Sequence, residues 1–543
     1  MRLLPWFGLV LLLQPLVGAS PRVAAACGLL HGFFFYGLSL RWIYDVMHVH
    51  GDLSPVSAAG VLLSFVLYLS VFPIAFALLF SFISRRSMAK AFAAAPILWV
   101  AVEFARTHAP ILGFQWNQLG YAVWYDLGLL QVVTLTGIYG LTFLVASYNA
   151  LLAWALTERS RKALTVWFVC ALAIVGVEQV GKRFVPEERP AHSAVLVQTN
   201  FPEAPSYPAN WMEQHAGEMD QLEERSVEAV KKSLDSSFEV PPNGWRISVP
   251  FTFRQEGNPP QANVTTKPNL IIWPEAPAPF YFLDPKFAAR AEKIARDSGA
   301  HFLVGVVEWR PGPNNRLLPY NSAVMLDPAG KRVFQYDKIH LVPFGEYVPL
   351  RRLLTFASQL TAEVGGYQAG TGYSVGELPD KPAPWEMRTP GPPHKFGAFI
   401  CFEAVFPNLV RQFTANGAEL LINISNDGWY GRSVAPDQHL AMARVRAVEN
   451  RRWLLRATNN GYTVAIDPYG REVASLKSDI RGVLRAPYSF RSDRTIYSRF
   501  GDWFAWLCVI VAIGLLVAAG LAPPKGAALR LRSGQASSAP TKG

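Results

Sequence analysis

The chain has 543 residues, of which 51% are hydrophobic and 17% are charged. This composition excludes an intrinsically disordered protein, and four cysteines are too few to staple a chain of this length. The net charge of +11 first suggests nucleic acid, but many basic residues lie beside apolar runs, where they are typical of membrane topology signals. The sequence therefore predicts a membrane protein with more than one structural unit and no nucleic-acid partner.

Apolar runs long enough to cross a bilayer, which requires about 20 residues, lie at both ends of the chain. Three contain no Asp, Glu, Lys or Arg: Leu53–Ser84, Leu127–Thr157 and Trp503–Ala522. Four weaker runs are Leu3–Ser20, Val23–Leu40, Met88–Phe104 and Ala163–Val177. We predict a bundle of about six transmembrane helices in residues 1–190 and one C-terminal transmembrane helix in residues 501–523. Buried helices of a soluble protein are the alternative.

Between these runs, residues 191–495 carry frequent charges and short apolar segments. Buried strands are predicted at Val195–Val197, Leu270–Trp273, Phe302–Val307, Ala398–Ile400 and Leu420–Ile422. Helices are predicted at Asp284–Ser298, Pro407–Asn416 and Ala435–Arg452, and long Pro- and Gly-rich loops at Val240–Pro268 and Thr371–His394. This alternation indicates an α/β layered domain. Residues 524–543 are predicted to be a disordered cytoplasmic tail.

Basic residues in the short loops indicate the orientation, because positive residues stay in the cytoplasm. They are Arg22, Arg85, Arg86, Lys90, Arg159, Arg161 and Lys162, with Lys525, Arg530 and Arg532 in the tail. We predict a multi-pass membrane protein, with residues 192–493 outside the cytoplasm and a cytoplasmic C-terminus. This places Met1 outside, which indicates a lost first helix or a misassigned start codon. A cleaved signal peptide ending near Ala19 is the alternative.

One cysteine differs from the others in its surroundings. Cys27, Cys170 and Cys508 lie in apolar runs, whereas Cys401 follows the predicted strand that ends at Ile400. A single thiol at a strand end in an oxidising compartment is either reactive or a plain buried residue. Cys401 is therefore a candidate nucleophile.

Charged residues follow two further apolar segments. Glu275 comes after Leu270–Trp273, and Lys338 lies in the segment Tyr336–Glu346. A thiol needs a base to become a thiolate, and Glu275 could accept that proton. A fixed ammonium such as Lys338 could stabilise the oxyanion of a tetrahedral intermediate. Without convergence in space, Glu275 and Lys338 would be a surface pair.

The motifs around these residues resemble a known family. Trp273-Pro274-Glu275, the lysine block Tyr336–Pro349 and Ile400-Cys401 resemble the Glu-Lys-Cys triad of the carbon–nitrogen hydrolase, or nitrilase, superfamily. The block Tyr336–Pro349, with membrane helices on both sides, resembles the bacterial apolipoprotein N-acyltransferase family over almost the whole chain. The resemblance implies an integral membrane helical bundle with an extracytoplasmic nitrilase-like αββα sandwich. It also implies the bacterial inner membrane as the location, with the sandwich in the periplasm.

The resemblance also implies a reaction and its residues. An acyl chain passes from a phospholipid, typically phosphatidylethanolamine, to Cys401 as a thioester, and then to the α-amino group of the diacylglyceryl-cysteine of an apolipoprotein. Glu275 would be the general base and Lys338 the oxyanion stabiliser. Glu346 and Glu403 would orient the lysine and support the cleft.

Further expectations concern the surroundings of the site. Trp211 matches a family tryptophan on a mobile loop over the site, with an ordinary buried or surface tryptophan as the alternative. Phe402 stands where the family commonly has tyrosine, so a hydroxyl role is absent there. The family usually has seven helices before the catalytic domain, one more than predicted here. The segment Tyr347–Phe356 is predicted to lie at the lipid interface, with a core helix as the alternative.

His340, His394 and His439 are isolated in the sequence, so we predict neither a metal nor a cofactor. Two other functions remain open. A membrane-anchored amidase or nitrilase would use the same triad with water as the acceptor. A non-enzymatic protein would use the middle domain only to bind lipid or a partner.

Overall fold

The computed structural model describes residues 4–109, 113–188, 190–203, 207–208, 210–231, 267–347, 366–382 and 388–521. The chain divides into two compact units. The first comprises Met1–Arg41, Gly60–Lys182 and Asp502–Gly543, and the second comprises Trp42–Ala59 and Arg183–Gly501. The division differs from the predicted boundaries in two segments, because Trp42–Ala59 and residues 183–190 cluster with the second unit rather than with the N-terminal bundle.

Within the described ranges, five helices are long and apolar enough to cross a membrane. They are α4 (Pro55–Ser84), α5 (Met88–Thr107), α8 (Ile138–Glu158), α9 (Arg161–Arg183) and α16 (Trp503–Leu521). A sixth span results if α2 (Pro21–Ser39) forms a broken span with Trp42–His50, which comprises α3 (Trp42–Asp45) and η2 (Val46–His50). The predicted membrane-spanning composition is thus confirmed.

Two predicted spans are shorter than expected. Leu3–Ser20 contains only the 3-10 turn η1 (Leu4–Trp6) and the short helix α1 (Val10–Leu13). At about 1.5 Å per residue these cannot cross a hydrocarbon core of about 30 Å. Leu127–Thr157 is divided among α6 (Leu127–Leu130), α7 (Val133–Thr136) and α8. The last break lies at Gly137, whose φ of +64° favours glycine.

Close packing joins the helices of the first unit. A Cβ added to Gly28 of α2 would lie 2.6 Å from Cα of Ile74 in α4, so only glycine permits this approach. The buried carboxylate of Glu103 in α5 accepts hydrogen bonds from the Leu119 amide of η3 (Leu119–Val123) at 2.8 Å and from Thr142 Oγ1 of α8 at 3.0 Å. Glu103 therefore links three elements of the bundle.

Two six-stranded sheets form the second unit. The first has the order β12-β1-β2-β3-β4-β5 and the second β11-β10-β9-β8-β7-β6. The first sheet comprises β1 (His192–Gln198), β2 (Leu270–Ile272), β3 (His301–Pro311), β4 (Leu317–Leu326), β5 (Arg332–Asp337) and β12 (Gly482–Tyr488). The second comprises β6 (Val375–Leu378), β7 (His394–Ile400), β8 (Leu420–Ser425), β9 (Trp453–Thr458), β10 (Thr463–Ile466) and β11 (Glu472–Leu476).

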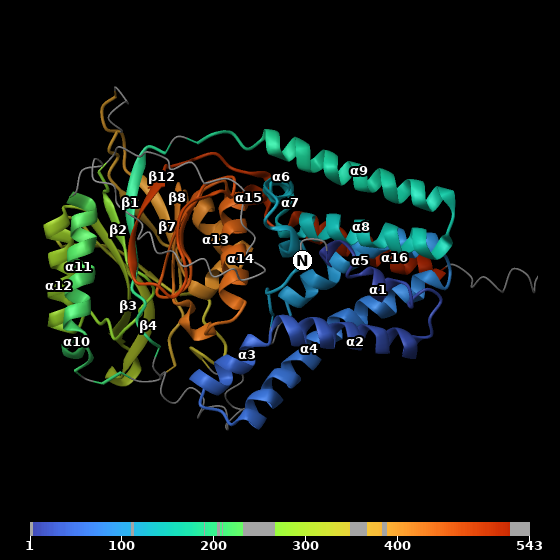
Figure 1. The fold of residues 1–543 in the computed structure, drawn as a ribbon, viewed down its shortest axis with the longest axis horizontal. Helices are drawn as coiled ribbons and strands as arrows, with labels where there is room; N and C mark the ends of the chain where they lie inside the picture. Colours follow the sequence, from blue (N-terminus) through green and yellow to red (C-terminus); the bar gives the residue numbers. More distant parts are fainter. Residues whose placement is uncertain are drawn as a thin grey trace, which may run out of the picture. The chain divides into compact units, whose positions relative to one another are not determined.

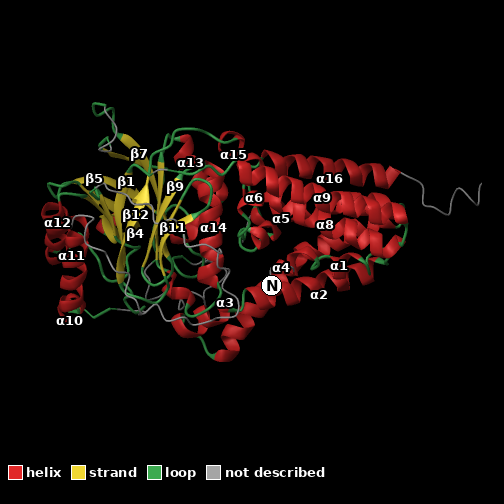
Figure 2. Cartoon of the chain, turned by 45° about the horizontal axis from the view of Figure 1, so that its top comes forward, coloured by secondary structure: helices red, strands yellow, loops and turns green. Residues whose placement is uncertain are grey.

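Helices cover the outer face of each sheet (Figure 1). Packed on the first are α11 (Ala216–Lys231) and α12 (Pro285–Ser298), and on the second α13 (Pro407–Ala415) and α14 (Ala435–Asn450). The sheets face each other, since β1 contacts β9 and β4 contacts β7. Figure 2 shows them as yellow layers between the helices. The predicted αββα sandwich is thus confirmed.

The predicted strands correspond to β1, β2, β3, β7 and β8, and the predicted helices to α12, α13 and α14. One loop prediction is wrong in part, because Thr371–His394 contains β6, whose residues Val375–Leu378 pair antiparallel with β7. Three other predictions fall on residues outside the described ranges: most of Val240–Pro268, most of Tyr347–Phe356, and the C-terminal tail.

Candidate active site

The three candidate catalytic residues each follow the end of a strand. Glu275 comes three residues after β2, Lys338 directly follows β5, and Cys401 directly follows β7. A Cβ on Gly305 of β3 would lie 2.5 Å from Cα of Glu275, so this glycine lets the glutamate segment lie against the neighbouring strand. The structure brings Glu275 and Lys338 into direct contact, and the surface-pair alternative does not apply because both are buried.

The ammonium of Lys338 lies between two carboxylates. Its Nζ donates to Glu275 Oε1 at 3.1 Å and to Glu346 Oε1 at 2.9 Å. The Lys338 side chain is 1% exposed, and those of the two glutamates are 8% and 12% exposed. Burial alone would lower the pKa of Lys338, but the charges of Glu275 and Glu346 raise it well above its usual value. The site therefore holds a permanent, fixed cation.

Backbone amides orient both glutamates. Glu275 Oε2 accepts from the Asn426 N–H at 2.9 Å, just after β8, and Glu346 Oε2 accepts from the Val342 N–H at 2.7 Å. Asn321, which the sequence analysis did not identify, donates from Nδ2 to Oε1 of both glutamates at 2.8 Å. Its only signal in the sequence is a polar residue inside a strand, β4, that is otherwise mostly apolar.

Cys401 occupies an unusual backbone conformation. Its φ is +49°, in the left-handed region that non-glycine residues seldom adopt, and the residue is 5% exposed. Burial raises the pKa of the Cys401 thiol, the Glu275 carboxylate raises it further, and Lys338 lowers it. The electrostatic influence of both residues on the thiol indicates that all three share one site. The resting group is a thiol, which needs a base before it can attack.

Glu403 connects two of the strand ends. Its Oε1 accepts from Tyr336 Oη at 2.7 Å, from the Ile339 N–H at 2.7 Å and from the His340 N–H at 3.1 Å. Its Oε2 accepts from the Ile400 N–H at 2.7 Å. Glu403 thus ties the backbone that follows Lys338 to the backbone that precedes Cys401.

Phe402 and Trp211 occupy different surroundings. Phe402 is buried and packs edge-on against Phe406, with ring centroids 5.1 Å apart. Trp211, the first residue of α10 (Trp211–Gln214), is 3% exposed and stacks on His215 within the core beside α11 and α12. The aromatic contacts of Trp211 are with core side chains, which is the buried-tryptophan alternative. A position over the site stays a prediction.

Glu203 is a further carboxyl near the site, partly exposed, that the sequence analysis missed. Its Oε1 accepts from Asn459 Nδ2 at 2.7 Å. Burial raises the pKa of Glu203 to about 8, against hydrogen bonds from Asn459 and Asn426, and the Glu275 charge adds to the rise. Its position five residues after β1 was its only signal. The raised pKa of Glu203 favours its protonated form in the folded chain.

We expect Glu203 to make stability depend on pH. The folded pKa of about 8 lies above the usual glutamate value of 4.5, so the folded state binds more protons between these values and its stability falls as pH rises through them. Glu203→Gln, a neutral amide, should remove this slope. Thermal unfolding of both proteins between pH 5 and 9 checks this: the variant should gain several degrees over the parent at pH 8.5. If the unfolding temperatures of the parent and of Glu203→Gln changed in parallel with pH, this prediction would be wrong.

Among the described residues, no group of three or more His, Cys, Asp or Glu side chains could hold a metal ion. What the arrangement offers is a thiol, a carboxylate base and a fixed ammonium at converging strand ends. These groups support acyl transfer through a covalent thioester.

Comparisons with known proteins agree with this chemistry. A family model described as carbon-nitrogen hydrolase matches residues 227–490, and one described as apolipoprotein N-acyltransferase N-terminal domain matches residues 1–151. A protein named apolipoprotein N-acyltransferase from Geobacter metallireducens is 32% identical over 527 residues, covering 96% of this chain and 91% of that protein. Its namesake from Methylococcus capsulatus is 31% identical over 504 residues, covering 91% and 87%.

A crystal structure of an amidase from Nesterenkonia sp. aligns with 60% of this chain and 98% of its own, at 17% identity and a TM-score of 0.35. The family matches show that the second unit is a carbon–nitrogen hydrolase domain on a bacterial membrane protein. The chain belongs to the apolipoprotein N-acyltransferase family, an acyltransferase family that takes a lipoprotein substrate and a phospholipid donor.

Proposed function

We propose that this chain transfers an acyl group from a phospholipid, typically phosphatidylethanolamine, to the N-terminal diacylglyceryl-cysteine of an apolipoprotein, through a thioester on Cys401. The observation that carries the proposal is the buried contact of Lys338 with Glu275 and Glu346 beside the Cys401 thiol. Apolar helices support it, because both substrates are held in a membrane by their acyl chains.

In the first half-reaction, Glu275 takes the thiol proton while the sulfur of Cys401 attacks the ester carbonyl carbon. The oxyanion that forms is stabilised by the ammonium of Lys338. The intermediate collapses by breaking the ester C–O bond, and the lysophospholipid oxygen leaves with the proton from Glu275. The acyl chain is now held as a thioester.

In the second half-reaction, the α-amine of the acceptor attacks the thioester carbonyl. Glu275 takes a proton from the nitrogen, the C–S bond breaks, and the proton returns to the sulfur of Cys401. The relatives named apolipoprotein N-acyltransferase, 32% and 31% identical to this chain, support an amine rather than water as the acceptor.

The test follows the acyl group. Purified protein in phosphatidylethanolamine vesicles should gain the mass of one acyl chain on Cys401, and a diacylglyceryl-cysteine peptide should then remove it and gain the same mass. Release of free fatty acid at the same rate with and without the peptide would favour the amidase alternative. No adduct with any phospholipid would overturn the proposal.

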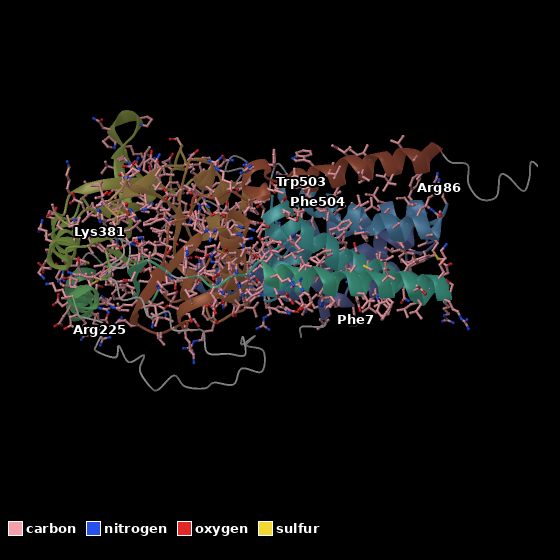
Figure 3. The ribbon with its side chains drawn as sticks, turned by 90° about the horizontal axis from the view of Figure 1, so that it is seen from above. Phe7, Arg86, Arg225, Lys381, Trp503 and Phe504 are labelled. Atoms are coloured by element: carbon pink, nitrogen blue, oxygen red, sulfur yellow. The ribbon has the colours of Figure 1, made fainter. Side chains whose placement is uncertain are left out.

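We propose that the protein lies in the cytoplasmic membrane, with the carbon–nitrogen hydrolase domain in the periplasm and the C-terminus in the cytoplasm. The alternation of α4, α5, α8 and α9 supports this, because it puts Arg85 and Arg86 on the same side as Arg159. Within the first unit, Arg86 and Trp503 lie at opposite ends of the helices (Figure 3). The basic loop at the Arg86 end fits a cytoplasmic position for that end.

We expect a thiol reagent that does not cross membranes to report this topology. Ser206 lies outside the described residues, so the exposed Lys331, between β4 and β5, is a better position for a cysteine. In a background without native cysteines, Lys331→Cys should be labelled in intact spheroplasts. The matched control, Arg161→Cys at the start of α9, should be labelled only after lysis. The reverse pattern would refute the orientation.

We expect Glu275→Gln to slow acylation of Cys401 by about 10²–10⁴-fold, because an amide cannot accept the thiol proton. The amide also turns a donor toward Lys338, Asn321 or the Asn426 amide, so thermal unfolding should be measured alongside. Glu308→Gln is the matched control. Glu308 is a buried carboxylate of β3 that accepts a hydrogen bond from Arg332 at 2.8 Å and takes no part in the chemistry. A well-folded Glu275→Gln that acylates at the parental rate would exclude Glu275 as the base.

A further inference from the structure

A buried chain of three polar side chains contacts the backbone of Cys401 and has no role in the proton transfers above. His439 comes from α14, Asp427 from the first residue of η7 (Asp427–Tyr430), and Arg456 from β9. Their side chains are 0%, 1% and 0% exposed. A buried charged network of this kind carries a desolvation cost, so its contact with the nucleophile requires a physical reason.

The contacts form one continuous path. His439 Nε2 lies 3.0 Å from the carbonyl oxygen of Cys401, and His439 Nδ1 lies 2.9 Å from Asp427 Oδ1. Arg456 Nη2 donates to Asp427 Oδ2 at 2.7 Å and lies 3.1 Å from His439 Nδ1. Because a carbonyl oxygen only accepts, Nε2 of His439 must carry the proton in this contact.

The far end of the path is electrostatically fixed. Burial alone would raise the pKa of Asp427, but the charges of Arg456 and His439 hold it well below its usual range. Asp427 is therefore an ionised acceptor, and Ser425 Oγ also donates to its Oδ1 at 2.8 Å. The imidazole of His439 is thus held on its Nδ1 side while its Nε2 side faces Cys401.

The backbone of Cys401 needs such restraint. A non-glycine residue at a φ of +49° persists only when its surroundings fix it. On the preceding side, Glu403 Oε2 holds the Ile400 N–H at 2.7 Å. On the following side, the 3-10 helix η6 (Cys401–Val405) begins at Cys401, and His439 Nε2 contacts the Cys401 carbonyl oxygen from α14. The two contacts together bracket the left-handed residue.

We propose that His439 is a positioning residue: its hydrogen bond to the carbonyl oxygen of Cys401, oriented by Asp427 and Arg456, holds the nucleophile's backbone in the left-handed conformation that aims the thiol at Glu275 and Lys338. The inference rests on the proposed function, in which Cys401 is the nucleophile. Losing the tether lets the thiol shift, and a misplacement of about 1 Å can cost about 10²-fold in rate.

Three substitutions separate this role from mere packing. His439→Leu removes both contacts of the ring. His439→Gln carries an amide nitrogen as many bonds from Cβ as Nε2, so it can restore the bond to Cys401. His439→Asn reaches only the Nδ1 position, so it keeps Asp427 and loses Cys401. The control is His301→Leu, a buried histidine at the opposite end of β3 from the site.

Two rates are measured on the full-length protein, with thermal unfolding recorded for each variant. One is thioester formation over a range of phosphatidylethanolamine concentrations. The other is alkylation of Cys401 by iodoacetamide, followed by peptide mass, which needs no lipid and stays informative if the proposed acyl donor is wrong.

We expect His439→Leu and His439→Asn to slow thioester formation at saturating lipid about 10²-fold, with little change in the half-saturating lipid concentration, and to lower the second-order rate constant of alkylation by a similar factor. His439→Gln should recover most of the loss, and His301→Leu should match the parent. If His439 had only a structural role, His439→Gln and His439→Asn variants with equal unfolding temperatures would lose equal amounts of both rates. That result, or parental alkylation in folded His439→Asn, would overturn the proposal.

Discussion

Cys401→Ala should form no thioester with any phospholipid. Removing a covalent nucleophile leaves no bond to hold the acyl chain, and such losses amount to at least about 10³-fold in turnover. We expect Cys401→Ser to form no acyl adduct either, because Glu275 and the other groups around this position are arranged for a thiol and not for a hydroxyl. Intact-protein mass after incubation with phosphatidylethanolamine is the measurement.

The other three cysteines provide the controls. Cys27, Cys170 and Cys508 lie in α2, α9 and α16 of the first unit, outside the carbon–nitrogen hydrolase domain. Each should tolerate alanine with activity retained, because a small buried or lipid-facing side chain replaces another. Parental acyl labelling in Cys401→Ala would mean that another residue is the nucleophile.

Lys338→Met should cripple both half-reactions, by about 10²–10³-fold, because each passes through an oxyanion that loses its ammonium. The burial of Lys338 adds a second consequence. An open cleft would let the variant fold normally, but the structure instead places the ammonium, 1% exposed, between Glu275 and Glu346. Removing it leaves two buried carboxylates without their cation, and we expect a loss of about 3–5 kcal/mol in unfolding free energy.

A double substitution separates the two effects. In Lys338→Met/Glu346→Gln, one of the two unpaired carboxylates becomes neutral, so part of the lost stability should return. The acylation rate should not return, because the oxyanion still lacks its cation. Recovery of the rate together with the unfolding temperature would mean that Lys338 acts only through folding.

The sequence could predict those residues of the site that lie in short local motifs. Glu275, Lys338 and Cys401 each follow an apolar segment, and apolar strands end where polar site residues begin. Asn321 escaped detection because nothing adjacent in the chain distinguishes an asparagine in β4 from any other polar strand residue. It matters only because β4 lies beside β5, which brings its amide between two glutamates.

Expectations about helices failed where backbone conformation overrides composition. Leu127–Thr157 contains no Asp, Glu, Lys or Arg and was predicted to hold one span; that span is α8, but it begins only at Ile138, after the chain turns at Gly137. Leu3–Ser20 is similarly apolar but forms only short helical pieces. Hydropathy reports which solvent a segment prefers, and it does not report where the helix is interrupted.

The sequence by itself determined the family, the membrane-spanning composition and the three candidate catalytic residues, because hydropathy and short motifs are properties of neighbouring residues. Only the tertiary structure decided that Lys338 is a buried ion bridging two carboxylates and that His439 holds the Cys401 carbonyl. These contacts join residues 63 and 38 positions apart. They depend on strand order and helix placement, which long-range packing sets and no local pattern encodes.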